Sequence, residues 1–198
     1  MIFKNSKEWM GVILCGGKSN PSGLDRGMIK YKEKELVLHT YALLNSVFPN
    51  TILSVNEKQF PLYKKKFQDT ELIVDSNQIR GPLSGILSVY SAYRVFNFFV
   101  LACDMVHLNP SLFKDLKSIY SKSPEYDFYV YQKNDSIEPF CGIYTSRGLE
   151  KIYNQYNQGL LKGFSIKEAI LLNNTHIIPV KKELLSCFAV YEEKAMIA

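Results

Sequence analysis

Asp104 stands just past the apolar run "FFVLAC", which is the most hydrophobic strand-like segment of the chain. A carboxylate in this position can hold Mg²⁺ against the phosphates of a nucleotide, because Mg²⁺ binds oxygen ligands and a buried strand gives rigid support. A helix cap is the other interpretation, but the next helix is expected to begin near Pro110, after five intervening residues. We therefore predict that Asp104 is a metal ligand.

A glycine-rich loop follows the first apolar segment, in "GVILCGGKSNPSGLD". Because glycine has no Cβ, the backbone amides of Gly16 and Gly17 can approach a phosphate or a base closely. Two familiar glycine loops do not fit: a P-loop would need glycine at Val12, and the dinucleotide fingerprint G-x-G-x-x-G is absent here. The loop is a candidate nucleotide site, and a simple chain turn is the alternative interpretation.

Polar side chains also follow two other strand-like segments: Asn56 comes after "TILSV" and Asp75 comes after "ELIV". Ligands of an open parallel sheet bind beyond the carboxyl ends of its strands, so we expect these groups along one edge with Gly16 and Asp104. A turn or a helix cap explains Asn56 equally well. Gly81 precedes a proline at a helix start whose free amides could face an anion, although alone this is an ordinary helix start.

The elements that must position these groups alternate between short apolar runs and helix-like segments, which is typical of an α/β fold with a mostly parallel sheet. Strands are expected at 10–15, 51–55, 71–75 and 98–102, and helices at 36–48, 59–67, 82–93 and 110–120. After residue 120 the pattern predicts strands at 128–131, 140–144, 175–180 and 187–191, with helices at 148–156 and 166–172. We expect residues 1–198 to form a single domain, since no repeat or long linker divides them.

The overall composition, with 46% hydrophobic and 22% charged residues, is typical of a globular protein. The formal charge of +5 suits an anionic ligand, and the densest basic run, residues 64–66, is expected to be a solvated helix face. Nucleic acid is therefore not an expected partner. The apolar stretch from Trp9 to Cys15 is too short to span a membrane and does not resemble a signal peptide, so no membrane association is expected.

The cysteines and histidines show no spacing that would build a reactive centre. The four cysteines lie far apart without a C-x-x-C pair, which argues against a zinc site and a disulfide scaffold and favours the reducing cytoplasm. The three histidines lie in unrelated contexts, so we interpret them as structural or surface residues.

A series of collinear motifs, from about Gly11 to about Tyr144, resembles the molybdenum cofactor guanylyltransferase family, within the larger group of nucleotidyltransferases. "GVILCGGKS" is similar to the family's L-x-G-G-x-S opening, "GPLSGI" to its G-P-L-A-G, "LACDMVHL" to its C-D-x-P segment and "IEPFCGIY" to a downstream piece. Asp25 and Arg26 stand where the family has aspartate and lysine.

The resemblance implies a three-layer Rossmann-like domain of the nucleotide-diphospho-sugar transferase type, which uses GTP and Mg²⁺. It gives Arg26 a phosphate-contacting place and Asp104 the metal-binding place, and it makes both residues catalytic. A glycine rather than an alanine at position 16 favours the guanylyl branch over the cytidylyl branch. The nucleotide-binding residues that it implies are Leu14, Cys15, Gly16, Gly17, Lys18, Arg26, Asn56, Asp75, Gly81 and Asp104.

The implied reaction is attack by the terminal phosphate of molybdopterin on the α-phosphorus of GTP, with release of pyrophosphate. That phosphate is already anionic, so alignment and charge neutralisation can supply the catalysis without a general base. Other cofactor-biosynthesis proteins and the molybdoenzymes that receive the product are the further partners implied.

Two alternatives stay open on the sequence alone. The first is a related nucleotidyltransferase that uses CTP or acts on a sugar phosphate. The second is a degenerate, non-catalytic protein that binds a nucleotide or a pterin, because Pro21 stands where the family has a basic residue and the C-terminal segment differs.

Overall fold

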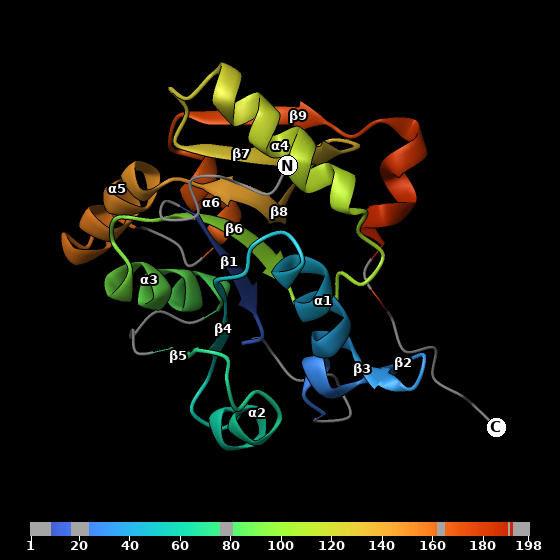
Figure 1. The fold of residues 1–198 in the computed structure, drawn as a ribbon. Coiled ribbons are helices and arrows are strands. Elements are labelled where there is room, and N and C mark those ends of the chain that lie inside the picture. Colours follow the sequence, from blue (N-terminus) through green and yellow to red (C-terminus); the bar gives the residue numbers. More distant parts are fainter. Residues whose placement is uncertain (1–8, 17–23, 76–80, 162–164, 190, 192–198) are drawn as a thin grey trace.

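A seven-stranded sheet crosses the middle of the protein in the order β5-β4-β1-β6-β8-β7-β9 (Figure 1). The structure is a computed structural model that describes residues 9–16, 24–75, 81–161, 165–189 and 191. Strand β8 runs antiparallel to its neighbours β6 and β7, and the other pairs are parallel, so the predicted mostly parallel sheet is confirmed. The strands are β1 (Trp9–Leu14), β4 (Thr51–Val55), β5 (Leu72–Val74), β6 (Asn97–Ala102), β7 (Phe128–Lys133), β8 (Ser136–Tyr144) and β9 (Thr175–Pro179).

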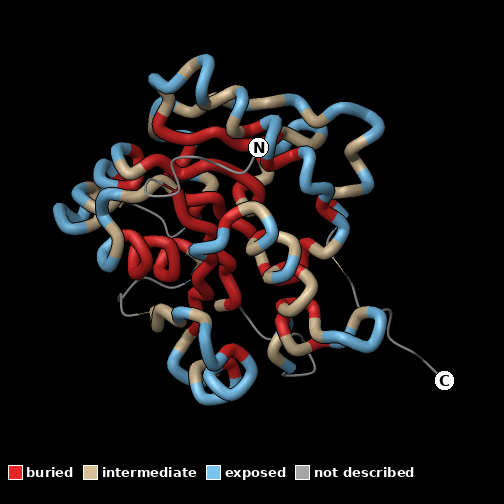
Figure 2. Tube along the Cα trace, viewed as in Figure 1, coloured by how far each residue is buried: buried red, intermediate tan, exposed pale blue. Residues whose placement is uncertain are grey.

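Helices cover both faces of this sheet and enclose two hydrophobic cores. The first face carries α1 (Leu36–Asn45), α2 (Phe60–Lys66) and α4 (Pro110–Lys122), and the second carries α3 (Pro82–Ala92), α5 (Ser146–Asn157) and α6 (Ile166–Leu171). Strand β1 supplies both cores by alternation, because Ile13 packs in the first and Val12 in the second. Buried positions gather in the central strands and α3 (Figure 2). The expected three-layer α/β arrangement is confirmed.

The helix that follows Asp104 has its own cap. The side chain of Asn109 accepts a hydrogen bond from the amide of Ser111 at 2.9 Å, and Pro110 occupies the first turn of α4. Asp104 therefore does not cap α4, and the helix-cap interpretation of Asp104 is wrong.

The predicted strand at 187–191 is wrong. Residues Lys182–Phe188 form a 3-10 helix, and its last ring, Phe188, packs against Tyr131 with 5.2 Å between ring centroids. Phe188 is buried whereas its neighbour Ala189 is exposed. Phe188, together with Leu184 and Cys187, thus packs this helical segment against the core.

Two further features of the β structure differ from the prediction. Strand β8 begins at Ser136, although 140–144 was the expected span, since Asn134 takes a φ of 54° that lets the chain turn directly from β7 into β8. A small hairpin, β2 (Lys30–Tyr31) with β3 (Lys34–Glu35), was not predicted. Its turn has Lys32 and Glu33 at positive φ, so it lacks the usual Asn-Gly signal.

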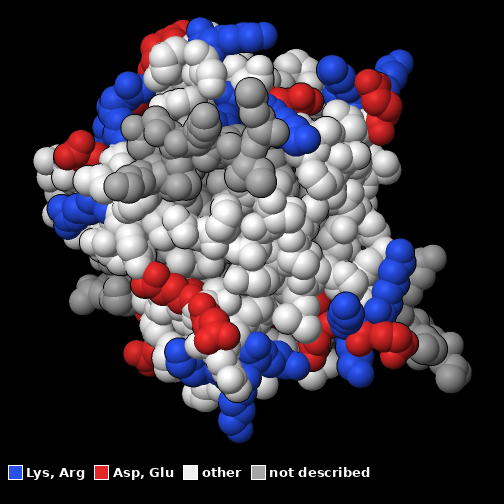
Figure 3. Space-filling model, in the orientation of Figure 1, with Lys and Arg blue, Asp and Glu red and all other residues white. Residues whose placement is uncertain are grey.

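Charged side chains of both signs are distributed over the face shown in Figure 3. Residues 64–66 are all exposed on α2, so the prediction of a solvated basic helix face is confirmed. Within the described ranges, no helix has the length and apolar character needed to cross a bilayer.

Candidate functional site

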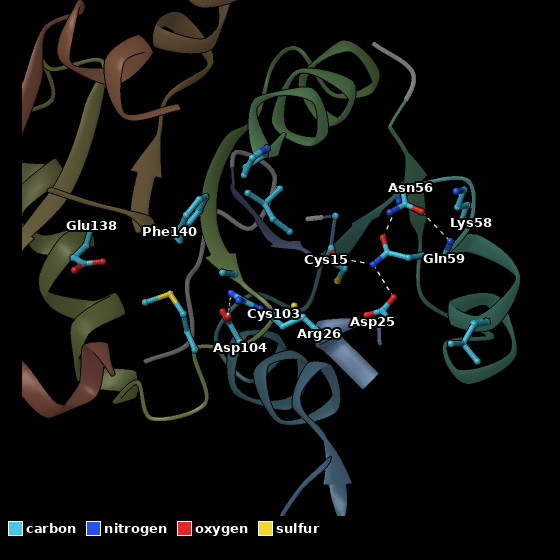
Figure 4. A pocket seen from close by; sticks show the side chains of 16 residues that line it. Cys15, Asp25, Arg26, Asn56, Lys58, Gln59, Cys103, Asp104, Glu138 and Phe140 are labelled. Atoms are coloured by element: carbon cyan, nitrogen blue, oxygen red, sulfur yellow. Dashed lines mark hydrogen bonds and ion pairs between the residues drawn. The ribbon is translucent and has the colours of Figure 1, made fainter. Parts of the chain in front are cut away.

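A cavity of about 540 Å³ opens at the carboxyl ends of β1, β4 and β6 (Figure 4). The loops that leave parallel strands converge at this edge, so the cavity gathers side chains that are distant in the sequence. The described residues that line it are Leu14, Cys15, Gly16, Asp25, Arg26, Asn56, Lys58, Gln59, Leu62, Pro82, Ala102, Cys103, Asp104, Met105, Glu138 and Phe140.

The structure brings together the strand-end groups expected along one edge. Gly16, Asn56 and Asp104 all line the cavity, and Asp75 lies directly behind Gly16. A Cβ on Gly16 would lie 2.9 Å from Asp75 Oδ2, so any other residue at position 16 would displace the Asp75 carboxylate. The predicted juxtaposition is therefore confirmed, whereas the ligands of these residues stay a prediction.

Gly81 stands at the start of α3, as expected, and its contact with an anion stays a prediction. Gly81 has a φ of 94°, a conformation that favours glycine, and it leads into α3. Pro82 lines the cavity, whereas Gly81 is not among the lining residues. Gly17 and Lys18, the other predicted nucleotide contacts, lie outside the described residues.

An ion pair joins the two predicted catalytic residues. Arg26 Nη1 lies 2.8 Å from Asp104 Oδ2, across 78 positions of sequence. The Asp104 side chain is only 3% exposed, whereas the Arg26 side chain is 50% exposed. The guanidinium carries five N–H donors, so Arg26 can donate to a ligand in the cavity while it stays paired with Asp104.

Asp25 organises the loop that carries Arg26, a role that the sequence did not reveal. Its Oδ1 accepts hydrogen bonds from the Gly27 amide at 2.9 Å and from the Tyr63 hydroxyl at 3.0 Å. Its Oδ2 accepts from Gln59 Nε2 at 2.7 Å, and the same nitrogen lies 2.9 Å from the carbonyl oxygen of Cys15. One carboxylate thus ties the Arg26 loop to α2, and Gln59 extends the tie to the end of β1.

Asn56 has the turn role that was one of its two interpretations. Asn56 Oδ1 accepts a hydrogen bond from the backbone N–H of Gln59 at 3.0 Å. In return, the backbone N–H of Asn56 donates to Gln59 Oε1 at 3.0 Å. This reciprocal pair starts the turn into α2 and holds Gln59 toward Cys15 and Asp25. The Asn56 side chain remains part of the cavity wall.

Asp75 has the most perturbed carboxylate at this edge. Burial raises its pKa to about 6, and the hydrogen bond from Ser54 Oγ at 2.8 Å opposes that rise without cancelling it. A carboxyl whose pKa lies close to neutral pH thus stands directly beside Gly16.

Glu138 and Phe140, from β8, form the wall opposite Asn56 and Gln59 (Figure 4). Arg26, Cys103 and Asp104 lie between these two ends. Neither residue was assigned a role from the sequence, although both lie in the motif "IEPFCGIY". Burial raises the pKa of the Glu138 carboxyl.

Asp104 offers a site that suits Mg²⁺ bound together with a nucleotide. In the described part of the chain, no three His, Cys, Asp or Glu side chains gather to hold a metal ion. Mg²⁺ commonly takes only one or two protein carboxylates, however, and completes its shell with water and phosphate oxygens. A single buried carboxylate at the end of a rigid strand, facing a cavity, fits this pattern.

The cysteines form no disulfide, and the histidines pack against aromatic rings. All four cysteines, at positions 15, 103, 141 and 187, carry free thiols. His39 and His107 pack edge-on against Tyr31, and His176 stacks on Tyr129. The structural interpretation of the histidines is therefore confirmed.

Known proteins of similar sequence carry molybdenum cofactor names. The chain is 27% identical over 150 residues to the molybdenum cofactor biosynthesis bifunctional protein of Synechocystis, covering 76% of this chain and 43% of that protein. It is 31% identical over 148 residues to the molybdenum cofactor guanylyltransferase of Syntrophotalea carbinolica, covering 73% of this chain and 66% of the relative. The chain thus spans less than two thirds of the length of these relatives.

A solved structure shares the fold over nearly the whole chain. Molybdopterin-guanine dinucleotide biosynthesis protein A from Archaeoglobus fulgidus superposes with a TM-score of 0.75, at 18% identity, covering 93% of each chain. The family described as the MobA-like NTP transferase domain matches residues 11–168, which contain all the described residues that line the cavity. The chain belongs to the MobA-like NTP transferase family.

Proposed function

We propose that the protein is a guanylyltransferase that joins the GMP unit of GTP to the terminal phosphate of molybdopterin and releases pyrophosphate. The observation that carries this proposal is the Arg26–Asp104 pair in the middle of one cavity, between two walls of different chemistry. The names of the relatives from Syntrophotalea and Archaeoglobus support this choice of substrates.

The end of the cavity formed by Leu14, Cys15 and Gly16 is the proposed site of the guanine base. Gly16 lets the base approach the backbone, and Asp75 lies immediately behind it. Guanine presents two adjacent N–H donors, and an ionised carboxylate is the strongest acceptor for such donors. Asn56 completes this end of the cavity, where it also holds Gln59 in place.

The two catalytic residues are proposed to act by charge and alignment. Asp104 would hold Mg²⁺, which when bound neutralises phosphate charge and orients the triphosphate. Arg26 would direct its half-exposed guanidinium to the α-phosphate, and Lys18 would add a second positive charge. The new bond forms between the acceptor phosphate oxygen and the α-phosphorus. The bond from the α-phosphorus to the bridging oxygen breaks, and pyrophosphate leaves with that electron pair.

We also propose that residues 1–198 act as one catalytic domain in the cytoplasm. The cavity draws on strands from both halves of one continuous sheet, which supports a single unit. Four unpaired thiols suit a reducing compartment. The same proposal includes other cofactor-biosynthesis proteins that deliver the substrate and molybdoenzymes that receive the product.

Turnover with each of the four nucleoside triphosphates, molybdopterin and Mg²⁺ tests the proposal. We expect pyrophosphate release and dinucleotide formation with GTP, and much slower reaction with ATP, CTP and UTP. Preference for CTP would make the protein a cytidylyltransferase. Saturable nucleotide binding without turnover would make it a non-catalytic binding protein.

A further inference from the structure

The start of β8 lies beside Asp104 because β8 runs opposite to its neighbours. The antiparallel register pairs Val100 with Gly142 and Leu101 with Cys141. Residues that precede Cys141 therefore continue toward the carboxyl end of β6, where Asp104 follows. The reversed strand brings Glu138 and Phe140 to the edge at which the parallel strands end.

A bulge in β8 interrupts its pairing with β7 directly after Glu138, and Phe140 lies within that bulge. Val130 of β7 pairs with Gly142, but the next residue, Tyr131, pairs with Glu138, so residues 139–141 are skipped. Pro139 lacks an N–H and suits such an unpaired position, and its carbonyl oxygen accepts a hydrogen bond from the Tyr144 hydroxyl at 2.6 Å. Bulges of this kind redirect side chains beside active sites, and this one forms part of the cavity wall.

Glu138 presents an uncommitted carboxylate to the cavity. Its side chain is half-buried, and among the described residues it has no hydrogen-bond partner. Lys133 and Lys167 are close enough to stabilise its charge through space, but neither forms an ion pair with it. A partly desolvated carboxylate of this kind is well placed to accept hydrogen bonds from a ligand.

Phe140 supplies an aromatic surface next to this carboxylate. The ring is half-buried and packs against both hydrophobic cores, so its position is fixed from two sides. A fixed ring that borders a cavity can stack on a planar heterocycle. Glu138 and Phe140 together offer one stacking surface and one acceptor pair.

We propose that Glu138 and Phe140 form the subsite for the ring system of the acceptor, a pterin whose 2-amino and ring N–H groups donate to Glu138 while its face stacks on Phe140. The inference rests on the proposed function and identifies the part of the site that receives the second substrate. With the base of GTP at Gly16 and its phosphates at Arg26 and Asp104, the wall beyond Asp104 remains for the acceptor.

Guanine has the same 2-amino-pyrimidinone edge as a pterin, so the test must distinguish a pterin site from a guanine site at Glu138. Fluorescence anisotropy of 6-hydroxymethylpterin measures binding of the pterin ring, and 6-hydroxymethyllumazine has an oxygen in place of the 2-amino group. We expect the parent protein to bind the pterin about tenfold or more tightly than the lumazine, because the lumazine oxygen would face the carboxylate. Glu138→Gln should abolish this preference, whereas Glu125→Gln, on an exposed loop, should keep it.

Two further variants test the ring. Phe140→Leu should weaken binding of both heterocycles by about tenfold, in line with the loss of a stacking partner, and Phe140→Tyr should restore it. In the turnover assay, Glu138→Gln and Phe140→Leu should raise the KM for molybdopterin and leave the KM for GTP within about twofold of the parent value.

An unchanged pterin preference in Glu138→Gln would overturn the inference. A raised KM for GTP with an unchanged KM for molybdopterin would also overturn it, and would assign this wall to guanine. A different result would contradict the proposed function: a parent protein that prefers another nucleotide or shows no turnover. The two tests are independent, because the pterin preference is measured without any nucleotide.

Discussion

Asp104 and Arg26 form an ion pair, with 2.8 Å between Oδ2 and Nη1. The carboxylate is buried at the end of β6, and the guanidinium approaches it from the half-exposed side of the cavity. Arg26 thus places a cation against the carboxylate that we propose as the Mg²⁺ ligand. The two cations would compete for this carboxylate, and a triphosphate would give Arg26 a second anion to bind.

Removing the arginine should therefore expose this competition. Arg26→Gln leaves the buried Asp104 carboxylate without its partner, so we expect a loss of about 1–3 kcal/mol in the free energy of unfolding. Mg²⁺ should replace the missing charge and raise the melting temperature of the variant more than that of the parent. Thermal unfolding over a Mg²⁺ titration without nucleotide measures this. Equal shifts in the two proteins would show that Mg²⁺ does not bind at Asp104.

Asp25 should matter through the residues that it positions. Asp25→Asn keeps the size of the side chain but replaces one acceptor oxygen by a donor, which conflicts with at least one of its three hydrogen bonds. We expect a loss of about 1–2 kcal/mol in stability, together with a higher KM for GTP. Tyr63→Phe removes one of the same bonds and should have a smaller effect on both. The prediction fails if Asp25→Asn alters neither unfolding nor the KM for GTP.

Asp75 should make stability depend on pH in the weakly acidic range. Its pKa is about 6 in the folded protein against an ordinary value of 3.8, so the native state binds more protons than the unfolded chain between these values. The free energy of unfolding should accordingly fall as pH rises through this window, by about 3 kcal/mol, and stay lower above it.

Asp75→Asn should remove this dependence, because an amide does not titrate. Asp69→Asn, on an exposed loop, should keep the parent profile. Urea unfolding between pH 4 and pH 8 measures the difference between the three proteins. A parent protein whose stability rises across this range relative to Asp75→Asn would contradict the raised pKa.

The fold and the strand-end groups could be predicted because they follow from local patterns. Apolar runs located the central strands, and the rule for parallel sheets placed Asn56 and Asp104 at one edge. The contact between Arg26 and Asp104 could not be predicted, since it joins segments 78 residues apart. The same holds for Asp25, whose partners on α2 are distant in sequence and whose only local signal is its position before Arg26 and Gly27.

The cavity wall formed by Glu138 and Phe140 of β8 could not be predicted for a different reason. Pro139 discourages a strand assignment, so the expected strand began only at Phe140. The bulge that accommodates Pro139 depends on the register with β7, which the pattern of one segment does not determine. Glu138 thus remained outside the predicted site although it lines the cavity.

Asp104→Asn tests the proposed guanylyl transfer at its centre. The amide retains the shape and one oxygen acceptor but loses the charge that would bind Mg²⁺. Steady-state release of pyrophosphate from GTP and molybdopterin should be followed over a Mg²⁺ titration for the parent, Asp104→Asn and Asp115→Asn, with melting temperature as the folding control. Asp115 lies exposed on α4, so its variant should match the parent. We expect Asp104→Asn to remain folded and to lose about 100-fold or more in turnover. A folded Asp104→Asn protein that reaches the parent's rate at low Mg²⁺ would show that Asp104 is not the metal ligand of this reaction.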